Sequence, residues 1–370
     1  MKVLHIITGL TKGGAENTLY RLCIASKNKG IKNYVVSLTN KGEIGQNLET
    51  EGIYVYNLNL KKNIFFFFKI FSLKKIIKQI DPDIVQTWMF HSNLIGGIFA
   101  KLCNIKKIFW NLRHSNLEFG KSNIFTILID FILRLFSYFI PYKIITCSYN
   151  NIFIYKKKYN RKLDYIYIPN GYDYLSTNIN FVINNEKNDS TFKLGMLANY
   201  RKQKNFPLLI STLSELKNKI TKFHCYLAGE RVDKNNNELV QLIRKYKLEN
   251  NITLLGKINN TEVLFNKIDL HILSSTFGEA FPNSIAESML YGIPNVSNNI
   301  GDSKIIIGEN GWVTNSFNSK DLSINILKAY QMRYNDFNKW IKLKENCHKK
   351  IIKSYSIEKM VNNYISEWNK

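Results

Sequence analysis

Short apolar segments alternate with helical segments along the whole chain, and this alternation constrains the fold more than any other feature. In the first half, VLHII (residues 3–7) and IVQTW (84–88) have the length and β-branched content of buried strands. Similar segments return in the second half at FKLGMLAN (192–199), FHCYLAG (223–229) and DLHILSS (269–275). Because strands that alternate with helices form parallel sheets, the sequence predicts an α/β protein with two Rossmann-like domains.

The length and one turn-rich segment predict how the chain divides. A chain of 370 residues is longer than a single core usually supports and suits two domains. A proline and an Asn-Gly pair within 168–173 mark a turn, and the asparagine-rich stretch 176–190 has the composition of an exposed linker. We therefore expect one domain over residues 1–170, a second over 171–350 and a terminal helical tail over 351–370.

Charge and cysteine content narrow the functional classes. The net charge of +24 suits a nucleic acid partner, an anionic membrane surface or simply a lysine-rich composition. The lysines are spread along the chain and no nucleic-acid-binding module is visible, so we expect no nucleic acid partner. The five cysteines are scattered and include no CxxC pair, which indicates a reducing compartment. Met1 and Lys2 lead directly into the first strand segment, so we expect no signal peptide.

Two apolar segments raise the question of a membrane. Residues 60–80 combine four successive phenylalanines with lysines at helical spacing. Two readings stay open: a domain helix with a snorkelling basic face, or a helix lying in the plane of an anionic membrane. The second segment, 124–145, is interrupted by Asp130, Arg134 and Pro141. Charges at the centre of a spanning helix are costly, so we expect this segment to form a helix and a strand that do not span.

The stretch FGEAFPNSIAESM (277–289) carries the strongest functional pattern. It follows an apolar strand segment and places Glu279 and Glu287 on either side of a Pro-Asn-Ser helix start. In open α/β sheets, ligands bind at the carboxyl ends of the strands. Backbone N–H groups at 283–285 are placed to attract a phosphate, and two carboxylates beside a phosphate suit the hydroxyls of a nucleotide sugar.

This pattern resembles the signature of glycosyltransferase family 4. The two glutamates have seven residues between them, the first follows Phe-Gly, and the second is followed by Tyr-Gly-Ile-Pro (291–294). The resemblance extends from Lys2 to Trp312. It implies a retaining enzyme of the GT-B fold, with two Rossmann-like domains facing each other across a cleft. It also implies that Glu279 contacts the donor sugar and Glu287 the ribose, and the other donor-binding candidates in this stretch are Phe281, Pro282, Asn283 and Ser284.

A basic loop supplies the expected diphosphate contact. Residues 200–205, YRKQKN, follow one strand segment and precede a helical one. Cations there are well placed to stabilise a leaving diphosphate, which gains negative charge during glycosyl transfer. The resemblance implies a basic pair at this loop, and we assign it to Arg201 and Lys204, although one form of the family pattern would align Asn199 with the arginine. We interpret Lys202 as a solvated lysine.

The first half contributes further candidates at the ends of its strand segments. Gly13 and Gly14 lie between the first strand segment and the first helix, and glycines there let a phosphate approach the backbone. The glycine spacing alone is also typical of an ordinary helix start. The resemblance implies a histidine facing the donor sugar, and His114 is the candidate. His91 is a weaker candidate, for a contact with the acceptor. We interpret His5 as a packing residue.

No metal or cofactor is expected. Residues 81–83, Asp-Pro-Asp, resemble the DxD metal motif of other glycosyltransferases. They precede a strand segment, so we expect them at the amino edge of the sheet, away from the cleft. No other metal-binding pattern is visible.

The sequence thus predicts a retaining glycosyltransferase that moves a hexose or N-acetylhexosamine from a nucleotide sugar, and we expect that donor to be UDP-linked. The resemblance to bacterial surface-polysaccharide enzymes of capsule and lipopolysaccharide synthesis implies a polyprenyl-diphosphate-linked or oligosaccharide acceptor. It also implies that the first domain binds the acceptor, the second binds the donor, and the tail packs back on the first. We expect the protein in the cytoplasm, peripheral at the inner face of the plasma membrane. The alternatives are a UDP-sugar epimerase of the same fold and a basic membrane-binding protein without activity. Asp302 replaces a glycine frequent in the family, which leaves sugar selectivity open.

Overall fold

The computed structural model describes residues 1–11, 13–60, 66–113, 115, 124–173, 190–220 and 222–370. These divide into two compact units. Unit 1 comprises residues 1–171 together with 357–370, and unit 2 comprises residues 172–356. The expected linker, 176–190, lies almost entirely outside the described residues. The tail assigned to 351–370 begins later, at 357, because residues 351–354 complete the last helix of unit 2.

Unit 1 is built on a parallel sheet of seven described strands in the order β3-β2-β1-β4-β5-β6-β7. The strands are β1 (Lys2–Ile7), β2 (Lys32–Ser37), β3 (Tyr54–Asn57), β4 (Ile84–Trp88), β5 (Lys107–Leu112), β6 (Lys143–Thr146) and β7 (Tyr165–Tyr167). The helices are α1 (Gly14–Lys27), α2 (Gly42–Thr50), α3 (Phe66–Ile80), α4 (Met89–Leu102), α5 (Ile124–Phe136), α6 (Tyr149–Lys158) and α14 (Ile357–Asn369).

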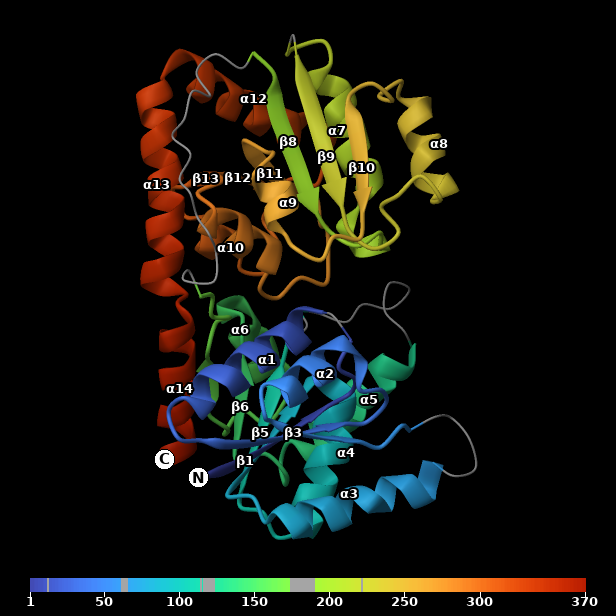
Figure 1. Ribbon diagram of the computed structural model, residues 1–370, viewed down its shortest axis with the longest axis vertical. Helices are drawn as coiled ribbons and strands as arrows, with labels where there is room; N and C mark the ends of the chain where they lie inside the picture. Colours follow the sequence, from blue (N-terminus) through green and yellow to red (C-terminus); the bar gives the residue numbers. More distant parts are fainter. Residues whose placement is uncertain (12, 61–65, 114, 116–123, 174–189, 221) are drawn as a thin grey trace. The chain divides into compact units, whose positions relative to one another are not determined.

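The sheet of unit 1 is buried on both faces. Alternate residues of β1 illustrate this, because Leu4 and Ile6 belong to one apolar cluster and Val3 and Ile7 to another. This explains why its strands read as continuous apolar runs in the sequence. The second cluster also contains residues of α1 and α14, which lie side by side in Figure 1. The C-terminal helix therefore completes the core of unit 1.

Unit 2 repeats the architecture with six described parallel strands in the order β10-β9-β8-β11-β12-β13. The strands are β8 (Phe192–Leu197), β9 (Phe223–Ala228), β10 (Ile252–Gly256), β11 (Leu270–Leu273), β12 (Asn295–Asn298) and β13 (Gly311–Thr314). The helices are α7 (Phe206–Leu216), α8 (Asn237–Lys245), α9 (Glu262–Phe265), α10 (Asn283–Leu290), α11 (Ser303–Ile307), α12 (Ser319–Asn335) and α13 (Phe337–Ser354), with a 3-10 turn, η2, at Lys202–Lys204. The prediction of two parallel α/β sheets is confirmed.

Two segments that cross between the units pair with each other inside unit 2. Tyr172 and Ser356 form an isolated parallel bridge, and the Tyr172 N–H donates to the carbonyl of Tyr355 at 2.9 Å. The chain thus enters unit 2 at Tyr172 and leaves it at Ser356, two points that are paired neighbours.

Candidate active site

The strand order of unit 2 locates its ligand-binding edge. From β8 the chain proceeds to β9 and β10 on one side, and then to β11, β12 and β13 on the other. The order therefore reverses between β8 and β11. All these strands are parallel, so the loops after β8 and β11 emerge at one edge, and a crevice at such a switch point is where open α/β sheets bind ligands. The predicted basic loop and the Glu279 loop are these two loops.

The loop after β8 holds Lys204 against the end of β11. Lys204 ends η2, and the next residue, Asn205, adopts a left-handed conformation with φ 48° and caps α7 by accepting from the Leu208 N–H. The Lys204 carbonyl accepts a hydrogen bond from Ser274 Oγ at 2.7 Å, and the Gln203 carbonyl accepts from the Thr276 N–H at 3.0 Å. Backbone contacts thus fix the position of the lysine.

The side chains of Lys204 and Glu279 form an ion pair. Glu279 Oε1 contacts Lys204 Nζ and also accepts from Ser275 Oγ at 2.9 Å. The side chains retain 17% and 10% of their accessible surface, so both charges are shielded without being sealed from solvent. A partly buried charge is stable only with a partner. The two predicted donor contacts are thus each other's charge partner.

The other two basic residues of the loop are more exposed than Lys204. Arg201 and Lys202 are both exposed. Asn199, the other position considered for the arginine, accepts a hydrogen bond from the Glu230 N–H at 2.9 Å and so joins the loops after β8 and β9. Arg201 has room to reach a ligand, while Asn199 has a structural role.

Glycines allow neighbouring loops to approach this site closely. Gly301, in the loop after β12, has φ +53°, and a Cβ there would lie 2.4 Å from the Ala280 carbonyl oxygen. Gly229, after β9, has φ +152°, and a Cβ would lie 2.0 Å from the carbonyl oxygen of Ala198. Asp302, which follows Gly301, is buried and donates its N–H to the Ala280 carbonyl at 2.9 Å. These contacts fix the backbone beside Glu279.

The start of α10 is held by aromatic side chains. Phe281 stacks on Tyr172, with ring centroids 6.4 Å apart, and meets Tyr355 edge-on at 5.4 Å. The hydroxyl of Tyr172 contacts Asn283 Oδ1 at 2.5 Å. The Ile285 N–H donates to the Pro282 carbonyl at 3.1 Å, so this amide, expected at a phosphate, is engaged within the turn.

The remaining candidates of this stretch lie on the same helix. Pro282 is the N-cap of α10, and Ser284 is buried in the first turn. Glu287 is half-buried on the second turn. Glu279 thus lies in the loop before α10 and Glu287 on the helix itself, and their roles at a donor stay a prediction.

The candidates of the first half belong to unit 1. Gly13 is the N-cap of α1 in an extended conformation, and Gly14 is its first helical residue, as expected. His114 lies outside the described residues. His91 is half-buried on α4, and burial lowers the pKa of its imidazole. Residues 81–83 form the turn between α3 and β4 and bond through Asp83 to the amino end of β1, so they lie at the edge predicted for them.

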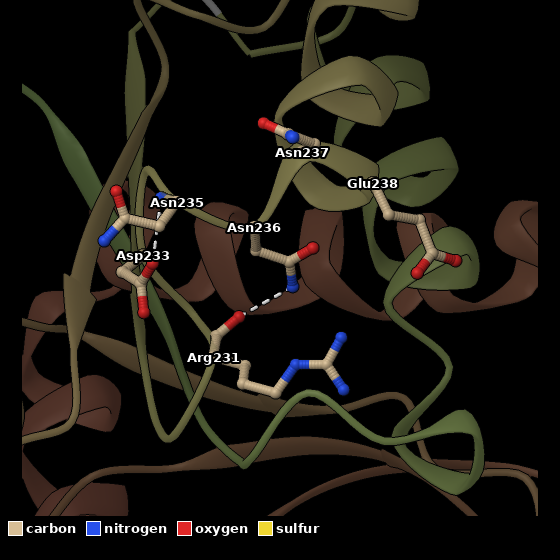
Figure 2. A pocket seen from close by; sticks show the side chains of 6 residues that line it. All are labelled: Arg231, Asp233, Asn235, Asn236, Asn237 and Glu238. Atoms are coloured by element: carbon tan, nitrogen blue, oxygen red, sulfur yellow. Dashed lines mark hydrogen bonds between the residues drawn. The ribbon is translucent and has the colours of Figure 1, made fainter.

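One feature of the ligand-binding edge was not predicted. A pocket of about 380 Å³ lies in the loop between β9 and α8 (Figure 2). Its lining residues are Arg231, Asp233, Asn235, Asn236, Asn237 and Glu238. Figure 2 shows the Asn236 amide bonded to the Arg231 carbonyl, at 2.7 Å. The signal in the sequence was a mostly polar run directly after β9 and the glycine that follows it.

The pocket adjoins the basic loop. The Arg231 guanidinium lies 5.8 Å from the ring centre of Tyr200, the residue before Arg201. Burial, reinforced by the nearby Glu238 carboxylate, raises the pKa of Tyr200 to about 12. The Tyr200 N–H also donates to the Glu230 carbonyl at 2.9 Å. The loops after β8 and β9 thus form one continuous polar surface.

Comparison with known proteins assigns this architecture to a family. A model described as Glycosyltransferase Family 4 matches residues 12–174, and one described as Glycosyl transferases group 1 matches residues 179–353. The chain belongs to the glycosyltransferases of the family 4 type. Its two-sheet architecture is the GT-B fold, which confirms the fold class and the family expected from the sequence.

Individual relatives of this family 4 chain are distant. An uncharacterized glycosyltransferase of Methanocaldococcus jannaschii is 25% identical over 273 residues, which cover 70% of this chain and only 65% of that relative, just under two thirds. The capsular polysaccharide biosynthesis glycosyltransferase CapH of Staphylococcus aureus is 24% identical over 307 residues, covering 81% and 82% of the two chains. The structure of Anabaena HepE in complex with UDP and glucose has a TM-score of 0.83 at 18% identity, covering 100% of this chain and 99% of that one.

The described residues also bear on membranes and metals. No helix in the described part of the chain is long and apolar enough to cross a membrane. Within the same residues, no three His, Cys, Asp or Glu side chains gather into a group that could hold a metal ion. Metal independence stays a prediction.

Proposed function

We propose that this glycosyltransferase transfers a hexose or N-acetylhexosamine, with retention of configuration, from a UDP-sugar to a polyprenyl-diphosphate-linked or oligosaccharide acceptor. The product would enter a bacterial surface polysaccharide. The observation that carries the donor assignment is the Lys204–Glu279 ion pair at the switch point of unit 2. HepE, which shares the fold, has been solved with UDP and glucose, and CapH is named for capsular polysaccharide synthesis.

The ion pair suits the charge changes of glycosyl transfer. When the bond from the sugar to the diphosphate breaks, the leaving diphosphate gains negative charge, and a preorganised cation stabilises that charge. In our proposal the diphosphate binds Lys204 in place of Glu279, and Arg201 is a second cation from the exposed part of the same loop. Glu279 is then released to accept hydrogen bonds from the donor sugar.

The neighbouring groups suit the rest of the donor. Glu287, half-buried on the second turn of α10, can accept from the two ribose hydroxyls. The pocket beside Tyr200 offers amides and the Arg231 guanidinium to the nucleoside. From unit 1, we assign His114 to the sugar and Gly13 and Gly14 to the approach of the phosphate. We propose that no metal takes part.

The decisive experiment compares two lysines of one loop. Lys204→Ala should lower the turnover of a UDP-sugar with a lipid-linked acceptor by about 10² to 10³, because one preorganised contact to the developing charge is lost. Lys202→Ala removes an equal charge from an exposed position and should leave turnover nearly unchanged. Circular dichroism should show both variants folded. Equal small losses would refute the diphosphate assignment.

The product distinguishes transfer from the alternative chemistry. Incubation of a UDP-sugar with the lipid-linked acceptor should yield a glycosylated lipid whose anomeric configuration, read by NMR, matches that of the donor. Incubation without acceptor should leave the sugar unchanged. An epimerised UDP-sugar in that second reaction would instead identify an epimerase of the same fold.

A further inference from the structure

Helix α5 carries its apolar side chains on the outside of unit 1. Five residues at helical spacing along one side are more than half exposed, and we call them the α5 apolar face. They are Ile124, Leu128, Phe131, Leu135 and, just past the end of the helix, Phe139, with exposed fractions from 54% to 73%. A surface helix of a globular protein normally turns such a stripe toward the core.

The opposite side of α5 holds the polar contacts. Asp130 is buried, and its carboxylate accepts from Arg134 Nη2 at 2.7 Å and from the Tyr159 hydroxyl. Ser137 Oγ accepts from the Asn160 N–H at 3.0 Å. The orientation of α5 is therefore fixed by specific bonds to the segment after α6. The outward position of the apolar face belongs to the fold itself.

Other large apolar side chains on the same segment are also exposed. They are Phe125, Tyr138 and Tyr142. Soluble monomers rarely leave so many large apolar side chains together in water, and a patch of this kind marks a binding surface. The mixture of phenylalanine, leucine and tyrosine is typical of groups at the boundary between lipid and water.

The charge around the face indicates its partner. Between residues 124 and 164 the sequence has seven basic residues and two acidic ones, the buried Asp130 and the exposed Asp164. The basic residues are Arg134, Lys143, Lys156, Lys157, Lys158, Arg161 and Lys162. Lys156, Lys157, Arg161 and Lys162 are exposed and flank Tyr159 and Asn160, which contact α5. This charge attracts an anionic surface and opposes a second copy of the same face.

We infer that the α5 apolar face is a docking site for an anionic lipid bilayer. In this arrangement α5 lies in the plane of the interface, with its side chains among the acyl chains and the neighbouring lysines against the headgroups. Each exposed lysine near an anionic leaflet strengthens this attraction. Such docking would bring the enzyme to a lipid-linked acceptor. This purpose rests on the proposed function, whereas the docking itself does not.

This location differs from the segment that the sequence suggested. In the described part of α3, Leu73 and Ile77 are fully buried and Ile80 nearly so, within the core of unit 1. Phe71 is exposed on the same helix. The phenylalanine run at 65–68 lies outside the described side chains. Phe71 therefore provides a matched control, an exposed aromatic of unit 1 that is not on the α5 apolar face.

The test is sedimentation of the full chain with lipid vesicles, without donor or acceptor. The wild type should bind vesicles that contain half phosphatidylglycerol and should bind pure phosphatidylcholine much less. The double variant Phe131→Ser, Leu135→Ser should lower the partition coefficient about tenfold or more, since each exposed side chain loses its transfer to lipid. Phe71→Ser should stay within about twofold of the wild type.

A second double variant distinguishes a loss of membrane binding from a loss of folding. Lys156→Gln with Lys157→Gln leaves the apolar face intact and should weaken binding only to the anionic vesicles, by about tenfold. Unchanged binding in both double variants would overturn the inference. So would a wild-type dimer that the Phe131→Ser, Leu135→Ser variant converts to a monomer, because the occupant would then be a second copy. A failed transfer assay with intact vesicle binding would count against the proposed function alone.

Discussion

At the scale of single residues, each unit contains a buried histidine that its hydrogen bonds hold in the neutral form. In unit 1, Trp88 Nε1 donates to His5 Nδ1 at 3.3 Å, so Nε2 carries the proton and faces Asn33 Oδ1 at 3.1 Å. In unit 2, the Leu197 N–H donates to His271 Nε2 at 3.3 Å, so the proton is on Nδ1, 2.7 Å from Asn295 Oδ1. A second proton on either ring would place N–H against N–H.

These histidines make stability depend on pH. Burial lowers the pKa of both His5 and His271 from 6.5 to about 4. Below pH 6.5 the two histidines therefore bind protons in the unfolded chain but not in the folded chain. The free energy of unfolding that they contribute above pH 6.5 is lost as the pH falls toward 4. Between pH 7.5 and pH 5 each unit should lose about 2 kcal/mol from this source, as measured by urea denaturation. His5→Gln should flatten the profile of unit 1 and leave that of unit 2 unchanged; an unaltered slope in both would contradict the assignment.

Some roles of single residues could be predicted from the sequence, and others could not. The interpretation of His5 as a packing residue is confirmed by its full burial. His271 gave no such signal, because its partners come from β8 and β12, far away in sequence. Lys204 and Glu279 were each predicted from their own motif. Their contact was not, because it joins loops 75 residues apart.

At the scale of elements, α14 is a part of unit 1 supplied from the end of the chain. Tyr364 and Trp368 are fully buried there. The Tyr364 hydroxyl accepts from Asn111 Nδ2 at 2.7 Å, and Trp368 Nε1 donates to Gln86 Oε1 at 3.3 Å. Glu367 forms an ion pair with the buried Lys143 at 2.9 Å. The helix therefore binds its unit by both apolar and polar contacts.

Two tryptophans test how the elements are divided. Trp368→Ala should destabilise unit 1 by about 3 to 5 kcal/mol, the usual cost of truncating a buried tryptophan. Trp340→Ala is the matched change in unit 2, where Trp340 is fully buried in the core cluster. Hydrogen exchange measured by mass spectrometry should report each loss only in the unit that contains the tryptophan. Equal effects of Trp368→Ala on both units would contradict the assignment of α14 to unit 1.

The elements that the sequence did not predict are short edge strands. Strands β7 and β13 have three and four residues and are only partly buried. They lie at the ends of their sheets, where one neighbour is enough, so they need no long apolar run. Strands such as β1, β4 and β9 were recognisable as apolar segments because both faces of a strand between two layers of helices are buried.

At the scale of the whole molecule, each unit has its own apolar core. Lys204 and Glu279, the two donor-site candidates that contact each other, both lie in unit 2. A ligand that binds only the native form of one unit stabilises that unit. UDP at about 100 times its dissociation constant should therefore add about 2.7 kcal/mol to unit 2, which holds most of the proposed donor contacts. Hydrogen exchange with UDP and with GDP measures this. Protection confined to unit 1, or equal protection by both nucleotides, would contradict the proposed donor.

The sequence by itself determined the fold class, the two parallel sheets and the positions of the candidate donor-binding loops. These follow from local patterns, because apolar periodicity defines the elements and the residues at strand ends define the loops. Only the tertiary structure decided that Lys204 meets Glu279, that a polar pocket adjoins them and that the apolar side of α5 faces outward. Each of these depends on which distant segments are neighbours. For α5 the deciding contact is the bond from Asp130 to Tyr159, 29 residues away, which turns the polar side of the helix inward.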